Sequence, residues 1–304
     1  MNPEPRHQDD YSDRQVEAAR RVLIDLGQVL ASFTDCMVVV GGWVPDLLIS
    51  TATEPHVGSI DVDVALDTDR LGDGRYAEML KLLLDTKRYR KGQKEFQLVA
   101  NVNLGDGEPP VQVELEFLAQ RGAKLKKNRP KLLAGFRILQ IDGCQVAFHA
   151  PIEQVLSGRN VRGAENTVRL LVASLADFLL MKALAIGGRD KPKDSYDLCF
   201  TLDHLPGGIE TVAEQWKARA TDPLVIRAVN TLREKFAGVD TFGPQQVAEF
   251  RNAINPEESE IEARRAFELV QRFLRLLESA APPPVLVSRK KNSSASKKRG
   301  SGMK

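Results

Sequence analysis

Apolar residues recur along this chain with two different periods. In the first half they alternate with polar residues over short segments, which is typical of β-strands with one buried face. The strands expected from this pattern lie at residues 37–42, 60–67, 94–101 and 111–118, with a hairpin at 136–148. Helical spacing between them predicts helices at residues 13–33, 43–50 and 75–86.

From residue 151 onward the apolar residues follow a period of about 3.6, which predicts a run of helices. These helices are expected at residues 174–188, 193–205, 209–219, 223–236, 244–253 and 258–279. The fold class that follows is α/β (α+β), a mixed sheet with flanking helices followed by a helical C-terminal part.

The same pattern divides the chain into four parts. Residues 1–11 are expected to form a flexible leader, residues 12–150 an α/β domain, residues 151–281 a helical domain and residues 282–304 a disordered basic tail. Three prolines begin the tail, and its later residues are mostly Lys, Arg, Ser and Gly, a composition typical of disorder.

Composition excludes several classes of protein. Of the 304 residues, 42% are apolar and 28% are charged, as in an ordinary folded protein. No apolar run approaches the roughly 18 residues that a membrane-spanning helix needs, and the polar start predicts no secretory signal. Cys36, Cys144 and Cys199 are too scattered for a disulfide framework or a zinc site. We therefore expect a reduced, cytoplasmic protein with no membrane partner.

The net charge of +2 hides an asymmetry. Residues 289–304 contain seven Lys and Arg and no acidic residue, so that 36 Lys and Arg elsewhere face 41 Asp and Glu. The folded part is thus expected to be acidic. Any broad attraction to polyanions such as RNA should come from the tail.

Two glycines stand where the first predicted strand meets a predicted helix. Without side chains, Gly41 and Gly42 allow backbone N–H groups to approach a phosphate at the helix N-terminus. A glycine pair also serves in plain tight turns, so this feature alone leaves both interpretations open.

The next predicted strand carries two acidic side chains on one face. Asp61 and Asp63 are two residues apart, and side chains at that spacing point to the same side of a strand. Two adjacent carboxylates are costly unless a cation joins them, and carboxylates with phosphate oxygens are what Mg²⁺ prefers. The alternative is the solvated face of an edge strand, because Asp67 and Asp69 follow.

A later predicted strand can add a third carboxylate. In VQVELEFL (111–118), the acidic residues Glu114 and Glu116 share one face, opposite the apolar residues. Beside the first two carboxylates, one of them would complete a trio able to hold two metal ions. An alternating surface strand is again the alternative.

The order of these segments resembles a known superfamily. GGW, GSIDVDVAL and VELEFL are similar to the DNA polymerase β-like nucleotidyltransferases. The later segment LADFLLMKALAIGGRDKPKDSYDL (175–198) resembles the signature of AbiEii-type nucleotidyltransferases, the toxin components of type IV toxin–antitoxin systems. The matching segments span residues 37–198. The resemblance implies a polymerase β-like mixed sheet.

The resemblance also implies roles for the acidic residues. Asp61, Asp63 and Glu114 match the metal-binding and catalytic carboxylates, in a site that holds two Mg²⁺ ions. Glu116 is the alternative third carboxylate, because a glutamate replaces the aspartate common in the superfamily. Asp194 matches a further catalytic acid, although a helix N-cap is its alternative reading.

The nucleotide-binding residues implied by the resemblance are Gly41, Gly42, Ser59 and Lys182. Ser59 matches a hydroxyl residue near the phosphates, and Lys182 matches a helix lysine that reaches the triphosphate. The alternative for Lys182 is a lysine packed along a helix with its head in solvent. Asp197 is interpreted as structural, and the four histidines as structural or surface residues.

The function implied is transfer of a nucleoside monophosphate from a nucleoside triphosphate to an acceptor hydroxyl, with tRNA or another RNA as the acceptor and a cognate antitoxin as a partner. Small-molecule acceptors, as in antibiotic-modifying relatives, and protein acceptors remain alternatives. A nucleotide-binding pseudoenzyme or a regulatory interaction module is the alternative of another class.

Overall fold

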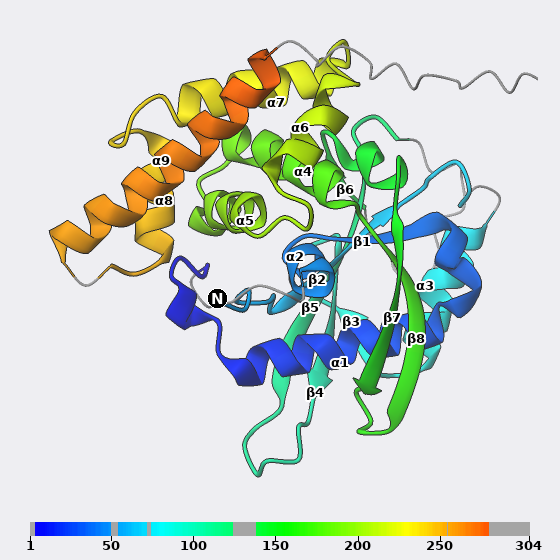
Figure 1. The fold of residues 1–304 in the computed structure, drawn as a ribbon. Coiled ribbons are helices and arrows are strands. Elements are labelled where there is room, and N and C mark those ends of the chain that lie inside the picture. The colour runs from blue at the N-terminus through cyan, green and yellow to red at the C-terminus, as the bar shows by residue number, and fades with distance from the viewer. Residues whose placement is uncertain (1–3, 50–53, 72–73, 124–137, 254, 280–304) are drawn as a thin grey trace, which may run out of the picture.

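The computed structural model describes residues 4–49, 54–71, 74–123, 138–253 and 255–279. The predicted tail at 282–304 lies outside the described residues. Within these ranges, eight strands form one mixed sheet. Seven of them follow the order β3-β4-β5-β2-β1-β8-β7, and β6 pairs with β5 at the side. Figure 1 shows this sheet on one side of the molecule and most of the helices on the other.

The sheet is built from strands that mostly match the predicted ones. They are β1 (Met37–Val40), β2 (Asp61–Leu66), β3 (Tyr89–Lys91), β4 (Gln97–Val102), β5 (Val111–Gln120), β6 (Leu139–Ile141), β7 (Ile152–Arg159) and β8 (Glu165–Val172). The central strands β2 and β5 run parallel, and β1 is antiparallel to β2 and parallel to β8.

The helices also follow the predicted order. They are α1 (Asp13–Val29), α2 (Trp43–Leu48), α3 (Arg75–Asp85), α4 (Leu175–Gly188), α5 (Pro192–Asp203), α6 (Ile209–Lys217), α7 (Pro223–Lys235), α8 (Phe242–Phe250) and α9 (Pro256–Glu278). Among the helices of the described ranges, none combines the length and the apolar character needed to cross a membrane.

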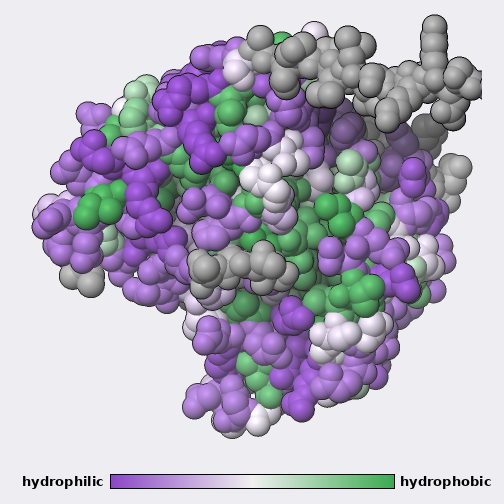
Figure 2. Space-filling model, in the orientation of Figure 1, coloured by the Kyte–Doolittle hydropathy of each residue, from purple (hydrophilic) through white to green (hydrophobic). Residues whose placement is uncertain are grey.

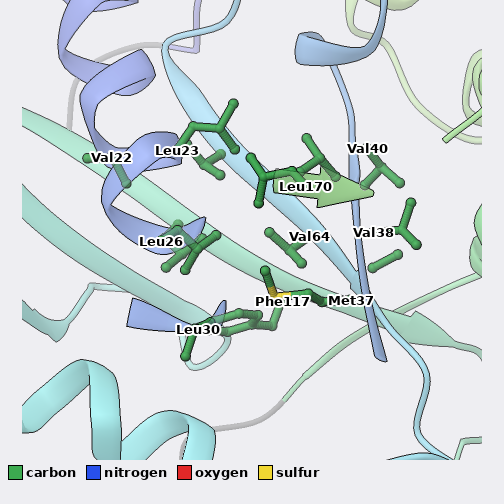
Figure 3. Packing of buried hydrophobic residues seen from close by; sticks show 14 of the residues in the cluster. Val22, Leu23, Leu26, Leu30, Met37, Val38, Val40, Val64, Phe117 and Leu170 are labelled. Atoms are coloured by element: carbon green, nitrogen blue, oxygen red, sulfur yellow. The ribbon is translucent and has the colours of Figure 1, made fainter. Parts of the chain in front are cut away.

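One face of the sheet is covered by α1. Its buried residues Val22, Leu23 and Leu26 pack with side chains of β1, β2, β5 and β8, as Figure 3 shows. Val64 and Phe117 point into this core. Because side chains alternate along a strand, the residues between them face the opposite side of the sheet, where α4 and α5 lie.

The helical part has its own core. Apolar residues of α4, α6, α7, α8 and α9 are buried around Trp216, whose indole nitrogen donates a hydrogen bond to the carbonyl of Ala176 at 3.1 Å. Figure 2 shows hydrophilic residues over most of this part, with hydrophobic residues gathered towards the centre of the face in view.

Two predicted elements are wrong. Residues 152–172 are two antiparallel strands rather than part of a helical run, so the sheet continues past residue 150. Residues 138–148 are not a hairpin, because β6 pairs in parallel with β5 and Cys144–Phe148 form a 3-10 helix. Gly143 adopts a left-handed turn conformation, with φ of 82°, but the segment after it is largely buried and does not pair back as a strand.

Residues 4–11, for which the sequence predicts a flexible leader, lie against the helical part. A 3-10 helix spans Gln8–Asp10, and Arg6 forms ion pairs with Glu249 and Asp190 at 2.6 and 3.0 Å. The division of the chain at residues 11, 150 and 281 stays a prediction.

Candidate active site

The turn between β1 and α2 contacts the predicted acidic residues directly. Gly41 has φ of +73°, and a Cβ atom there would lie 2.5 Å from Oδ2 of Asp63. A Cβ on Gly42 would lie 2.7 Å from Nζ of Lys193 and 2.9 Å from Oγ of Ser59. Both positions therefore need glycine. Since α2 has only six residues, this close approach matters more here than a helix dipole.

The two aspartates of β2 share one face, as their spacing predicts. Ser59 Oγ donates to Asp61 Oδ1 at 2.6 Å, and the indole of Trp43 donates to the Asp61 carbonyl at 2.7 Å. Trp43 is buried and fixes the glycine turn to this strand. Ser59 therefore lies beside both the glycines and the carboxylates.

The electrostatic environment shifts the pKa values of the two aspartates in opposite directions. Burial, the charge of Asp61 and that of Glu116 raise the pKa of Asp63 to about 8. Burial also opposes the ionisation of Asp61, but Lys191 and the Ser59 hydroxyl outweigh it, and the pKa of Asp61 lies below its usual value. Two adjacent carboxylates of which one is hard to ionise fit a site for a divalent cation.

Both predicted glutamates face the aspartates. In the parallel pairing of β2 with β5, Asp61 is opposite Glu114 and Asp63 is opposite Glu116. The buried amide of Gln97, on β4, donates to Glu114 at 2.6 Å and to Glu116 at 3.1 Å. Across the described residues, no three acidic, His or Cys side chains are already gathered as metal ligands. The two aspartates alone fit Mg²⁺, which commonly takes one or two carboxylates and completes its shell with water and phosphate.

The junction of α4 and α5 supplies buried cations. Lys182 Nζ lies 2.7 Å from a carboxylate oxygen of Asp194 and 2.7 Å from one of Asp197. Arg189 also pairs with Asp194, at 2.7 Å. Although burial opposes ionisation of Asp194, Lys182 and Arg189 lower its pKa to about 2. Asp194 therefore holds Lys182 in place. It is not the helix N-cap, because α5 begins at Pro192 and its N-cap position is Lys191, whose side chain makes no capping hydrogen bond.

The sequence interpretation missed the network around Asp197. His56 Nε2 donates to Asp197 Oδ1 at 2.9 Å, because the other ring nitrogen accepts from the Gly58 amide at 3.1 Å. Lys193 Nζ also bonds to Oδ1, at 2.7 Å. Asp197 thus joins the loop that carries Ser59 to both lysines. The i, i+4 spacing of Lys193 and Asp197 was the only signal in the sequence, and none pointed to His56.

Cations and carboxylates face each other across the glycine turn. Lys191, Lys193 and Lys182 all lower the pKa of Asp61 through their charge. Burial makes Lys193 harder to ionise, and its pKa lies below the usual value. A triphosphate with a divalent cation has the complementary pattern, since the cation meets the carboxylates and the phosphates meet the lysines.

Comparisons with solved structures give distant similarities. The first is to an antigenic nucleotidyltransferase-like protein from Paracoccidioides brasiliensis, with 16% identity and a TM-score of 0.40, covering 74% of this chain and 89% of that one. The second is to JHP933 from Helicobacter pylori, with 14% identity and a TM-score of 0.40, covering 88% of this chain and 94% of that one.

A search of curated proteins found no match. A scan against family models matches residues 26–281 to the family described as "Nucleotidyl transferase AbiEii toxin, Type IV TA system". The matched range includes the glycine turn, both aspartates, both glutamates and the α4–α5 junction. This chain belongs to the AbiEii family of type IV toxin–antitoxin systems, and it is a nucleotidyltransferase.

Proposed function

We propose that the chain moves a nucleoside monophosphate from a nucleoside triphosphate to a hydroxyl group of tRNA, in a reaction that depends on Mg²⁺. The observation that carries this proposal is that Asp61 and Asp63 lie across the Gly41–Gly42 turn from lysines whose charge acts on Asp61. The acceptor oxygen forms a bond to the α-phosphorus, the bond to the β-phosphate breaks, and pyrophosphate leaves.

The carboxylates carry the metal and proton chemistry in this proposal. Asp61 and Asp63, with Glu114 as the third carboxylate, would hold Mg²⁺, which when bound neutralises the triphosphate and favours ionisation of the acceptor hydroxyl. Glu114 accepts the hydroxyl proton. Burial raises the pKa of Glu114, which suits a carboxylate to this role as a base.

The phosphates are bound by the residues around the glycine turn. Gly41 and Gly42 let the backbone of the turn lie against Asp63, Lys193 and the Ser59 hydroxyl, so a phosphate bound at the turn would lie among these side chains. Lys182 and Lys193 supply positive charge from α4 and α5, and Asp194 orients Lys182 through its 2.7 Å contact. A cognate antitoxin, which the family description implies, is proposed as the protein partner.

The experiment incubates purified protein with Mg²⁺, each α-³²P-labelled nucleoside triphosphate in turn, and total tRNA, and separates the RNA on a denaturing gel. Asp63→Asn keeps the shape of the side chain but removes its charge. Asp69→Asn removes an exposed carboxylate just beyond the same strand and is the matched control.

We expect label in tRNA with the unchanged chain and with Asp69→Asn, and at least about a 100-fold loss with Asp63→Asn. Transfer that persists in Asp63→Asn contradicts the proposed site. If no label enters RNA but the nucleotide still stabilises the protein, the acceptor is a small molecule or a protein rather than tRNA. Absence of nucleotide binding favours an interaction module without transferase activity.

A further inference from the structure

The segment of residues 4–11 lies beside the candidate active site, although it precedes residues 26–281, the part of the chain that the family model matches. Figure 1 shows it in dark blue next to α5 and α8. Arg6 holds it to Glu249 and Asp190, and His7 Nδ1 lies 2.9 Å from the Glu249 carbonyl oxygen. Asn252 also donates to Asp9, at 2.9 Å. Several independent contacts therefore fix this segment on the helical part.

The segment brings Tyr11 to the lysines of the α4–α5 junction. Lys193 Nζ lies over the ring of Tyr11, 5.4 Å from its centroid. The ring of Tyr11 also packs against Phe250 on α8, with ring centroids 5.7 Å apart in an edge-on arrangement. Burial and the charges of Asp197, Asp61 and Asp194 raise the pKa of the Tyr11 hydroxyl, which shows how close the ring lies to the carboxylates.

Lys193 is enclosed by contacts on three sides. Asp197 pairs with its ammonium at 2.7 Å, and on the side of the glycine turn the ammonium lies 2.7 Å from the position that a Cβ atom of Gly42 would take. The Tyr11 ring covers a third side. Asp197 alone would leave the flexible four-carbon side chain free to turn about that one contact, and the aromatic face restricts it.

From this arrangement we infer that Tyr11 is a positioning residue of the nucleotide site, whose ring holds the Lys193 ammonium beside Gly42 and Ser59. The segment 4–11 is then one wall of the site. This inference rests on the proposed function, because it takes the ammonium of Lys193 to contact a nucleotide phosphate. The ring face carries the interaction, so the hydroxyl of Tyr11 is dispensable.

The experiment compares Tyr11→Phe with Tyr11→Leu in the full chain. Phe keeps the aromatic face, whereas Leu keeps apolar packing on Phe250 and removes the interaction with the ammonium. Phe242→Leu is the matched control, because it removes a similar contact, 5.2 Å from Lys235, away from the glycine turn. The readouts are the KM for the nucleoside triphosphate, kcat, the Kd for nucleotide with Mg²⁺ by calorimetry, and the Tm.

We expect Tyr11→Leu to raise KM and Kd about tenfold while kcat changes less than about threefold. Tyr11→Phe and Phe242→Leu should stay within about twofold of the unchanged chain in KM. The double variant Tyr11→Leu with Lys193→Gln should be no weaker than Lys193→Gln alone, because Tyr11 acts through that lysine.

Three results would overturn the inference: additive losses in the double variant, equal losses in Tyr11→Phe and Tyr11→Leu, or an unchanged Kd in Tyr11→Leu. An unchanged Kd with an active enzyme leaves the proposed function intact. If the unchanged chain binds no nucleotide, the proposed function fails, and the inference fails with it.

Discussion

At the scale of single residues, a glycine determines how closely the turn after β1 approaches the Asp63 carboxylate. Gly41 combines a left-handed backbone with a contact to Asp63 that leaves no room for a Cβ atom. Gly105 has a similar φ of +79°, but nothing lies within 4 Å of the position of its Cβ. Substitution of Gly105 would therefore cause backbone strain alone, whereas substitution of Gly41 would cause both strain and a clash with Asp63.

Gly41→Ala and Gly105→Ala should differ in activity far more than backbone strain explains. Each substitution should lower the free energy of unfolding by about 1–2 kcal/mol, because it places a Cβ atom in the left-handed region. Only Gly41→Ala also displaces the Asp63 carboxylate, so we expect it to lose at least about 100-fold in transferase activity while Gly105→Ala keeps it. Urea unfolding and the labelling assay measure the two effects. Equal activity of the two variants would contradict the close approach of Gly41 to Asp63.

His56 is a buried neutral base that gives the fold a pH dependence. Burial and the charge of Lys193 lower its pKa to about 4, against about 6.5 in an unfolded chain. Between these values the unfolded chain binds the proton and the folded chain does not. This contribution to stability is therefore complete above about pH 6.5 and is lost as the pH falls towards 4.

We expect His56→Gln to remove this pH dependence, since a glutamine amide still donates to Asp197 but does not titrate. Titration of His56 should lower the free energy of unfolding of the unchanged chain by about 2 kcal/mol between pH 7 and pH 5. The decrease in the variant should be smaller by about 2 kcal/mol, because this titration is absent. Urea unfolding at four pH values measures the difference. Identical pH profiles would mean that His56 is already protonated in the folded chain at pH 5.

At the scale of elements, the register of two strands determines which carboxylates can meet. Pairing of β2 with β5 places Glu114 opposite Asp61 and Glu116 opposite Asp63. Lys94 Nζ lies 3.2 Å from Glu116, so part of the charge of that glutamate is already neutralised. Glu114 has the Gln97 amide as a neutral partner at 2.6 Å.

Glu114→Gln should therefore lower kcat by at least about 100-fold, and Glu116→Gln by less than about tenfold. Each glutamine has the shape of the side chain it replaces, and each variant is the control for the other. The labelling assay at saturating Mg²⁺ gives the comparison. The reverse order would assign the third carboxylate to Glu116.

The sequence predicted most elements but missed the short strand β3 and the strands β7 and β8. In β8 the buried residues Val168, Leu170 and Val172 alternate with exposed ones, yet the apolar run continues directly into α4, and a short apolar run fits a strand or a helix equally well. In β7, Ile152 and Val155 are 40% and 57% exposed, which obscures the alternation. The strands β7 and β8 are defined by their pairing with each other and with β1.

The acidic half of the candidate site could be predicted because its residues are close in sequence. Asp61 and Asp63 share a strand face by spacing alone, and the glycine turn is next to the adjacent strand. The cationic half could not be assigned in the same way. Lys193 and His56 meet at Asp197 only after α5 packs on the loop before β2, and that contact links residues 141 positions apart.

At the scale of the whole molecule, charge is divided between the folded part and residues 289–304, which hold seven Lys and Arg. Removing these residues changes the net charge from +2 to −5 and should weaken tRNA binding at low salt. The slope of log K against log salt should become smaller by up to about 5, because fewer counterions are released. Fluorescence anisotropy with labelled tRNA at 50–200 mM KCl measures the slopes. Equal slopes for the two chains would place RNA binding on the acidic folded part.

The contact between Arg6 and Glu249 joins residues 243 positions apart. During synthesis at about 5–20 residues per second, the first of these leaves the ribosome about 12 to 50 s before the second. Late in that interval the strands that carry the carboxylates have been synthesised and can fold, but Tyr11 does not yet have α8 to pack against. A chain that ends before α8 therefore lacks the helix that holds this wall of the proposed nucleotide site. Under the inference above, the site is complete only after α8 has been translated.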